Sequence, residues 1–335
     1  MRKLLVYLPL VVSTPAVAFD EQTMLKVFFN IVQVHAINID NSGEGFGSGV
    51  VVAEHRVLTN CHVLHKAKSA WISQGEDSYP IDGVKIDAHH DLCLLVSDRL
   101  PLKAAEIGSV GNLKDGMDVF ALGHSSGSPS PVMSDGQIKG LYPFEGSRII
   151  RSSAPFAMGA SGSGLFDDNG RLVGINTFKT FGKVAYFYAM PADWIAHLEA
   201  LPTQPVAPST GTAFWEDEKD RPFFLQAAIP ELQENWTELL QLSERWVAAD
   251  PDDAEAWYER GQAQEKLNML EAAQQSYQKT ISLDPAHGDA LFHLGIFASR
   301  RGDQGEMHRI SAALAQIDRV IAEDFNKAAG CTAAC

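Results

Sequence analysis

The sequence has little positive charge. Lys and Arg number 27 against 42 Asp and Glu, so the formal net charge is −15 at pH 7. A chain this acidic lacks the basic surface with which proteins bind nucleic acid or anionic lipid. Beyond residue 18 it also lacks an apolar run of the roughly 20 residues that span a bilayer. We therefore expect no nucleic-acid partner and no membrane span beyond residue 18.

Signatures of bound cofactors are missing as well. The chain has no nucleotide-binding loop and no haem or zinc motif. Its histidines do not form a clear set of metal ligands at His35, His55, His65, His89, His90 and His124. The sequence therefore predicts no cofactor and no metal.

The first 18 residues follow the pattern of a secretory signal peptide. Arg2 and Lys3 form a basic start, residues 4–12 form an apolar run, and residues 16–18 read Ala-Val-Ala. A small-x-small sequence of this kind is a cleavage site, which predicts a mature start at Phe19. The alternative is an uncleaved anchor, for which the apolar run is too short. The pattern predicts a periplasmic or secreted protein of a Gram-negative bacterium, with no stable membrane anchor after cleavage.

The rest of the chain divides by composition into two halves, as its 335 residues suggest. Residues 20–200 contain short β-type runs separated by turn residues, which is typical of an antiparallel barrel or sandwich. The runs are residues 31–34, 49–52, 56–59, 92–96, 118–122, 148–150 and 172–177. Residues 167–170, Asp-Asp-Asn-Gly, predict a hairpin turn. Residues 20–29 favour a short leading helix.

A Pro- and Thr-rich linker covers residues 202–213, and helix-favouring residues follow it. Asp250-Pro251 recurs 34 residues later as Asp284-Pro285. A 34-residue period of paired helices resembles the tetratricopeptide repeat. The alternative is a helical bundle whose Pro spacing is coincidental.

The repeat reading divides the second half further. The best copy runs over residues 254–287, with weaker copies at 221–253 and 288–325. We expect a helical repeat domain at 214–330 and a cysteine-containing tail at 331–335. Helical repeats commonly present a concave surface to a partner, so this domain is expected to bind a protein partner or the substrate.

Three short motifs in the first half carry the chemistry. They are residues 58–63, 90–95 and 159–164, and they supply His62, Asp91 and Ser161 in that order. A serine hydroxyl needs an adjacent base to become a nucleophile, and imidazole has a suitable pKa. A buried carboxylate fixes the orientation of that base. Small residues around Ser161 leave the N–H groups of Gly159 and Ser161 free to stabilise an oxyanion.

Together these motifs resemble the trypsin-like serine peptidases, particularly the bacterial HtrA/Deg branch. The resemblance covers residues 27–201 and extends to motifs at residues 47–51, 121–123, 136–138, 172–176 and 188–191. It implies a double six-stranded β-barrel over residues 19–201, with the triad in the cleft between the barrels. It also implies that His62 is the general base, Asp91 orients it and Ser161 attacks. Gly159 and Ser161 would form the oxyanion hole.

Two departures from the family bear on regulation. Ala160 stands where zymogens of the trypsin type carry an Asp that captures a new N-terminus, so that route of activation is not expected. The helical repeats replace the PDZ domain usual in the HtrA branch, so recognition of C-terminal carboxylates by such a domain is not expected either.

The resemblance also locates a substrate pocket. Pro155 would lie at its base, with Tyr186 or Tyr188 opposite a wall formed by Thr177, Phe178 and Lys179. No acidic residue is placed to pair with a basic side chain. We expect small or medium apolar side chains at P1, the residue before the cleaved bond.

Cysteine is scarce, and its four copies are Cys61, Cys93, Cys331 and Cys335. They allow three pairings in an oxidising compartment. Cys61 adjoins His62 and Cys93 follows Asp91 by two residues, so a shared active site would bring them together. We favour Cys61–Cys93, the alternative being two buried thiols. Cys331–Cys335 would close a small loop, the alternative being a frayed tail.

These features favour an exported serine endopeptidase that hydrolyses peptide bonds of protein or peptide substrates through an acyl-enzyme. The alternative, from another functional class, is a catalytically idle barrel that binds peptides or acts like a chaperone through its helical repeats.

Overall fold

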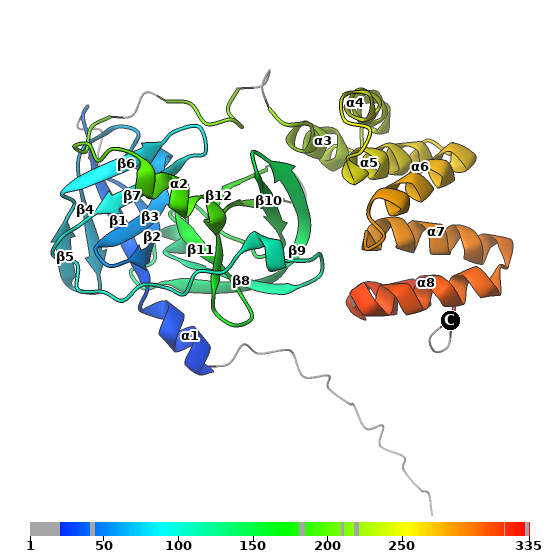
Figure 1. Cartoon of the computed structure of the whole chain (residues 1–335), viewed down its shortest axis with the longest axis horizontal. Helices are drawn as coiled ribbons and strands as arrows, with labels where there is room; N and C mark the ends of the chain where they lie inside the picture. The colour runs from blue at the N-terminus through cyan, green and yellow to red at the C-terminus, as the bar shows by residue number, and fades with distance from the viewer. Residues whose placement is uncertain are drawn as a thin grey trace, which may run out of the picture.

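The structure is a computed structural model that describes residues 21–40, 44–180, 185–208, 211–217, 221–317, 319–331 and 335. Two β-structures lie side by side, and a stack of helices follows them (Figure 1). The predicted signal peptide lies outside the described residues. Among those described, no helix has the length and apolarity that a membrane crossing requires.

The first β-structure is a seven-stranded antiparallel sheet in the order β5-β4-β1-β2-β3-β7-β6. Its strands are β1 Ile31–Asn38, β2 Glu44–Ala53, β3 Arg56–Asn60, β4 Ala67–Gln74, β5 Asp77–Pro80, β6 Gly83–Asp87 and β7 Leu92–Val96. The predicted two-part β architecture is confirmed, and in this half the seven strands form a half-barrel in place of a closed barrel of six. At its β6 edge, the main chain of Val84 pairs with Gln204 of the linker, which occupies the hydrogen-bonding groups needed for closure.

The second β-structure is a closed barrel of six strands in the order β10-β13-β12-β11-β8-β9. Its strands are β8 Asp118–Gly123, β9 Val132–Phe144, β10 Ser147–Ser152, β11 Ser163–Asp167, β12 Leu172–Lys179 and β13 Phe187–Pro191. Fully buried Phe120 and Phe166 stack in its interior with ring centroids 5.3 Å apart. This half confirms the predicted barrel.

Local sequence signals account for many of these elements. All seven β-type runs fall within strands, and the leading helix is α1 Glu21–Phe28. In the predicted hairpin turn, Asp167 Oδ1 accepts hydrogen bonds from the N–H groups of Asn169 and Arg171. Side-chain acceptors of this kind satisfy the turn's main-chain donors, which confirms the turn between β11 and β12.

Helices fill the second half of the chain. They are α3 Phe223–Leu232, α4 Trp236–Ala249, α5 Ala254–Lys266, α6 Leu270–Leu283, α7 Gly288–Arg301, α8 Gln304–Ile317 and α9 Arg319–Ala328, while the short α2 Ile195–Ala200 ends the β half. The α5–α6 pair coincides with the best predicted repeat. Asp253 caps α5 by accepting the N–H of Glu255, as a helix start requires.

The helical half packs directly on the second barrel. Phe224 of α3 stacks on Tyr142 of β9, with ring centroids 4.3 Å apart. Both side chains are buried and belong to one apolar cluster that continues to Leu239 and Ala256. The helices are therefore docked on the barrel and do not hang from a free linker.

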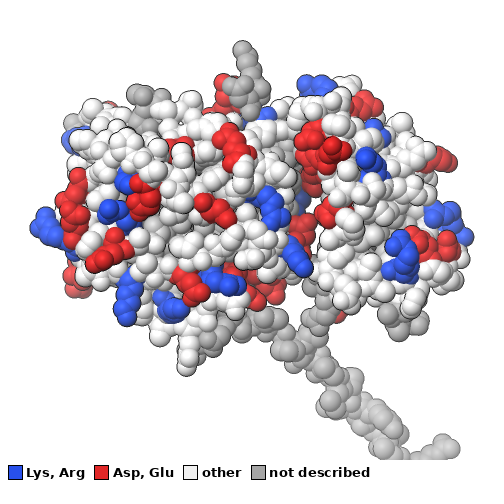
Figure 2. Space-filling model, in the orientation of Figure 1, with Lys and Arg blue, Asp and Glu red and all other residues white. Residues whose placement is uncertain are grey.

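Acidic and basic side chains are interspersed over both halves on the face shown in Figure 2.

Both disulfides are present. Cys61 and Cys93, 32 residues apart in the chain, join the turn after β3 to β7. Cys331 and Cys335 close the short loop of the tail. The first bridge lies in the apolar core of the first sheet, next to both His62 and Asp91.

Replacing both core cysteines, Cys61→Ala with Cys93→Ala, should lower the free energy of unfolding by about 3–4 kcal/mol, because a loop of this length is no longer closed in the unfolded chain. Denaturant unfolding followed by circular dichroism measures the loss. As the matched control, Cys331→Ala with Cys335→Ala should cost about 2 kcal/mol or less. A larger loss from the tail pair than from the core pair would contradict this assignment.

Candidate active site

His62 is held by Asp91 through two hydrogen bonds. It lies in the 3-10 turn Cys61–Leu64 that directly follows β3. Its main-chain N–H donates to Asp91 Oδ1 at 2.7 Å, and its ring Nδ1 lies 2.5 Å from Asp91 Oδ2. Because Nδ1 is occupied, Nε2 is the ring nitrogen left for another partner. The His62 side chain is 36% exposed.

Asp91 itself sits in a tightly specified turn. Its φ is +54°, in the left-handed region that costs a residue with a side chain about 1–3 kcal/mol. Its carbonyl accepts the N–H of Cys61 at 3.1 Å and Nδ2 of Asn60 at 3.0 Å. With the Cys61–Cys93 bridge beside it, the turn is fixed against β3 from both sides.

Burial and charge shift both pKa values. Burial raises the pKa of the Asp91 carboxyl, against the hydrogen bond and charge of His62, which lower it. For His62, burial alone lowers the pKa, but the hydrogen bond and charge of Asp91 and the charge of Glu216 outweigh it, so the pKa is raised. The ring is thus a stronger base than an ordinary imidazole.

Ser161 belongs to the second barrel but is tied to the first sheet. Its carbonyl accepts the N–H of Ser48 in β2 at 2.8 Å. A side chain at Gly162 would collide with the Thr59 hydroxyl and the Ser48 carbonyl, so the loop is pressed against β3 just before His62. In the described part of the chain no hydrogen bond yet joins the half-buried Ser161 to His62, a bond that often tightens only with substrate bound.

The loop before Ser161 presents two free amide groups. Gly159 has φ +88°, which only glycine adopts readily. Within the described residues, neither the Gly159 N–H nor the Ser161 N–H has an acceptor. Both amides are therefore available to an oxyanion.

Two serines outside the predicted site orient this loop. The Ser126 N–H donates to the Met158 carbonyl at 2.7 Å, which fixes the opposite-pointing N–H of Gly159 across the trans peptide. The Ser48 hydroxyl donates to the Gly159 carbonyl at 2.9 Å and accepts the His124 N–H at 2.8 Å. Sequence reasoning noted the Gly-Ser-Gly motif around Ser48 but gave Ser48 no role.

Neighbouring Ser and Asp residues that could compete with Ser161 and Asp91 for the catalytic roles have other partners. Ser163 is 1% exposed, and its hydroxyl accepts Nδ2 of Asn176 at 3.0 Å. Asp87 pairs with His90 at 2.6 Å, and Asp82 accepts the N–H of Asp98. Of the candidate residues, His62, Asp91 and the Ser161 loop are the ones that the structure brings together.

The structure does not gather all the predicted substrate-pocket residues around one described cavity. Pro155 lines a small cavity between β8 and β9 together with Phe156 and Ala160. Thr177 is buried and bonded to Asn60, and Lys179 lies near the Phe187 ring.

The aromatic residues predicted for the pocket pack against other rings and a guanidinium. Phe178 stacks on fully buried Tyr188 at 4.9 Å between ring centroids, and on Trp215 of the linker side at 4.6 Å. Tyr186 lies under the guanidinium of Arg151, 4.8 Å from its ring centroid. The composition of the substrate pocket stays a prediction.

Residues 211–217 lie along the catalytic pair, although the sequence assigns 211–213 to the linker and 214–217 to the helical domain. The Phe214 N–H donates to the His89 carbonyl at 3.0 Å. Glu216 shares a narrow cavity with His62, Asp91 and Ala213, and its carboxylate accepts the Ala213 N–H. No local sequence signal indicates this contact, because the motif residues and the linker are over a hundred positions apart.

The comparisons with known proteins agree with this geometry. Residues 47–175 match the trypsin-like peptidase domain, and residues 254–287 match the tetratricopeptide repeat. Residues 47–175 form a trypsin-like peptidase domain. Its homologues include HtrA/Deg-like proteases, and a tetratricopeptide repeat follows it in the chain.

Two curated relatives show the range of similarity. Magnetosome formation protease MamE of Paramagnetospirillum magneticum is 33% identical over 148 residues, which are 41% of this chain and 20% of that protein. Periplasmic pH-dependent serine endoprotease DegQ of Escherichia coli is 31% identical over 162 residues, 45% of this chain and 35% of that protein. The chain thus spans about a fifth to a third of the length of these two relatives.

Among solved structures, the Rv3671c protease of M. tuberculosis in its active form aligns with a TM-score of 0.53 at 21% identity. The alignment covers 63% of this chain and 98% of that one. At this identity the likeness shows the fold alone, and it supports the two-part β architecture of the peptidase domain.

Glu216→Gln should lower the pKa of His62, because it removes a negative charge that favours the imidazolium. Titration of the histidine ring protons by NMR measures this pKa, with the His62 signal assigned through His62→Gln. Glu76→Gln, which removes an exposed carboxylate from the β4–β5 turn, should leave the His62 pKa unchanged. An unchanged or raised pKa in Glu216→Gln would contradict the assigned contact.

Proposed function

We propose that the peptidase domain is a serine endopeptidase in which His62, Asp91 and Ser161 act as a catalytic triad. The observation that carries the proposal is the double hydrogen bond from His62 to Asp91, which leaves Nε2 as the free basic nitrogen. The hydrogen bond from the Ser48 N–H to the Ser161 carbonyl supports it, because it joins the serine loop to β2, which pairs with the strand β3 that precedes His62.

The reaction follows from the order of these groups. His62 Nε2 takes the proton of the Ser161 hydroxyl as its oxygen attacks the substrate carbonyl, and Asp91 stabilises the imidazolium that forms. The N–H groups of Gly159 and Ser161 then bind the oxyanion, where one such donor is worth about 3–4 kcal/mol. His62 protonates the leaving amine, and water attacks the acyl-enzyme by the reverse sequence of proton transfers.

The basicity of His62 sets the acidic limit of activity. The imidazole must be neutral to accept the serine proton, and its pKa is raised above the ordinary value. Activity is therefore lost as the pH falls through that raised pKa and is present above it.

We further propose that the protein works in the periplasm or is secreted. The signal-like residues 1–18 and the two disulfides suit an exported chain, because disulfides persist in oxidising compartments. One homologue, DegQ of Escherichia coli, is a periplasmic endoprotease, which is in keeping with this proposal.

The substrates are proposed to be proteins or peptides with small or medium apolar P1 residues. The described residues that line the small cavity at Pro155 include no acidic side chain, so nothing there attracts a basic P1 side chain. The helical repeats are proposed to bind a protein partner or the substrate itself.

The competing function is peptide binding without turnover. The same cleft and repeats would then hold a peptide while the triad stayed idle. The free amides of Gly159 and Ser161 favour the hydrolase, because an idle barrel has no need of an oxyanion site.

Ser161→Ala should lower hydrolysis of an unbiased peptide library by about 10⁶-fold, since the nucleophile is removed while binding remains. It should also abolish labelling by a fluorophosphonate. Ser163→Ala is the matched control from the same loop and should keep labelling, provided that circular dichroism shows a native fold.

Labelling that survives Ser161→Ala would exclude the proposed nucleophile. Peptide binding by the wild-type chain, with no turnover and no labelling, would favour the idle barrel. A cleavage profile dominated by Lys or Arg at P1 would overturn the proposed specificity.

A further inference from the structure

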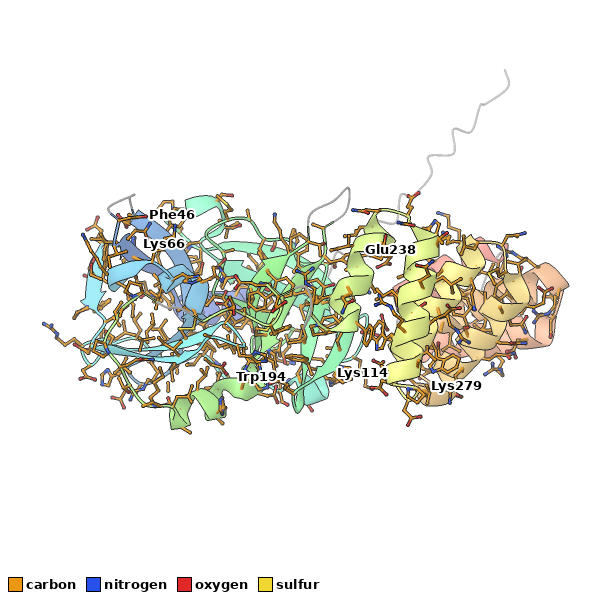
Figure 3. The ribbon with its side chains drawn as sticks, turned by 90° about the horizontal axis from the view of Figure 1, so that it is seen from above. Phe46, Lys66, Lys114, Trp194, Glu238 and Lys279 are labelled. Carbon is orange, nitrogen blue, oxygen red and sulfur yellow. A yellow bond between two sulfur atoms is a disulfide. The ribbon has the colours of Figure 1, made fainter. Side chains whose placement is uncertain are left out.

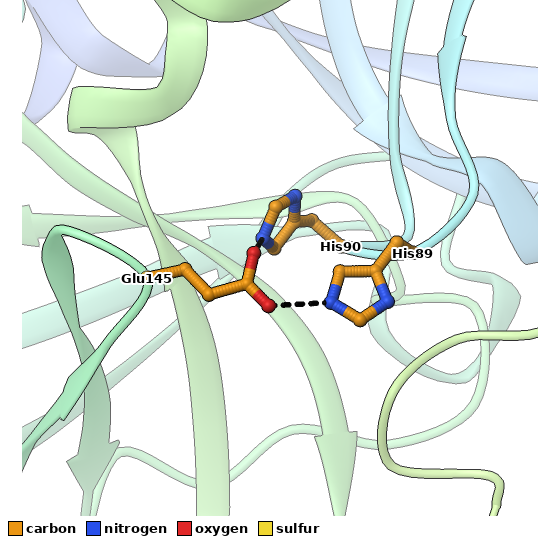
Figure 4. A group of neighbouring side chains, drawn as sticks. All are labelled: His89, His90 and Glu145. Carbon is orange, nitrogen blue, oxygen red and sulfur yellow. Dashed lines mark hydrogen bonds and ion pairs between the residues drawn. The ribbon is translucent and has the colours of Figure 1, made fainter. Parts of the chain in front are cut away.

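Three side chains, two from the first sheet and one from the second barrel, converge beside the catalytic turn. His89 and His90 lie in the turn between β6 and β7, and Glu145 lies in the hairpin turn between β9 and β10. His89 Nε2 is 2.8 Å from Glu145 Oε1, and His90 Nε2 is 3.0 Å from Glu145 Oε2 (Figure 4). The ligand-type atoms of the three residues all lie within 4.8 Å of one another.

A second carboxylate fixes the direction of His90. Its Nδ1 is 2.6 Å from Asp87 Oδ2, and its main-chain N–H donates to Asp87 Oδ1 at 3.1 Å. Histidines that bind metals usually donate their other ring N–H to a carboxylate in this way. With Nδ1 donating to Asp87, a neutral His90 directs the lone pair of Nε2 toward an oxygen that is itself an acceptor. A cation between the two atoms satisfies both.

Aromatic packing holds the rings in place and leaves the site accessible. The Trp194 ring lies 3.9 Å from the His90 ring between centroids, and Phe144 and Phe214 pack on His89. The His90 side chain is 11% exposed, whereas His89 and Glu145 are about half exposed. An ion can therefore enter from solvent and retain a water ligand.

We propose that His89, His90 and Glu145 bind a divalent transition-metal ion, with Zn²⁺ the best match. Two imidazoles and one carboxylate form a common zinc ligand set, with water as the fourth ligand of a tetrahedron. Tetrahedral Zn–N and Zn–O bonds of about 2.0–2.1 Å place ligand atoms roughly 3.3 Å apart. The two histidine–glutamate contacts at 2.8 and 3.0 Å need to open by a few tenths of an ångström, and ligand atoms that are up to 4.8 Å apart need to move closer, which the exposed His89 and Glu145 side chains permit.

The position of the site indicates a structural role for the ion. The site joins a turn of the first sheet to a turn of the second barrel. The His89 carbonyl also accepts the N–H of Phe214, in the segment of residues 211–217 that lies along the catalytic pair. His90 directly precedes Asp91, so a bound ion stiffens the turn that carries the orienting carboxylate. Figure 3 shows Trp194, which packs on His90, on the opposite side of the β half from Phe46. The Phe46 ring lies near Gly159 of the oxyanion loop.

The test is a Zn²⁺ titration of the full chain after chelator treatment and dialysis, in competition with a chromophoric chelator. We expect one stoichiometric site and a Zn²⁺-dependent rise in the unfolding temperature. Glu145→Gln and His89→Ala should each weaken binding by at least about 100-fold, and Asp87→Asn by about 10–100-fold. The measurement needs no activity, so its outcome is independent of the proposed hydrolase.

His35→Ala is the matched control. His35 also contacts a glutamate, Glu44, but no second histidine of the described residues converges there. This variant should bind Zn²⁺ as the wild type does. Absence of stoichiometric binding, unchanged binding in Glu145→Gln, or an equal loss in His35→Ala would overturn the proposal and leave the cluster as histidine–carboxylate ion pairs only.

Discussion

The arrangement of the active site depends on one buried carboxylate. Asp91 accepts hydrogen bonds from the main-chain N–H and the ring Nδ1 of His62, which fixes the ring and leaves Nε2 as its free nitrogen. The chain reaches this geometry through an uncommon backbone conformation at Asp91, with φ +54°. That conformation is held by Asn60, by the Cys61 N–H and by the Cys61–Cys93 bridge, all of which join the Asp91 turn to β3.

The nucleophile loop depends on β2, the strand that pairs with β3. Ser48 of β2 supplies a main-chain N–H to the Ser161 carbonyl and a hydroxyl to the Gly159 carbonyl, so one residue fixes both ends of the oxyanion loop. The base is thus built from the first sheet and the nucleophile from the second barrel, with β2 as the point where they meet. Packing of α3 on Tyr142 adds a third body to this assembly.

Features that a short motif encodes could be predicted from the sequence, whereas contacts between residues far apart in the chain could not. The β runs, the Asp167 turn, the 34-residue repeat and the Cys61–Cys93 bridge were predictable, because each has a local pattern or adjoins one. The open edge of the first sheet was not, because Gln204, far along the chain, pairs with Val84. The contact of Glu216 with His62 and the convergence of Glu145 on His89 and His90 also lack a local signal, since each partner lies over fifty residues away.

The most direct test of the central claim is the turnover number of Asp91→Asn. The amide keeps the shape of the carboxylate but favours the wrong tautomer of His62 and cannot stabilise an imidazolium. The account predicts a fall in kcat of about 10⁴-fold for a protein whose circular dichroism spectrum stays native. A natively folded Asp91→Asn protein that hydrolyses peptides at the wild-type rate would contradict it.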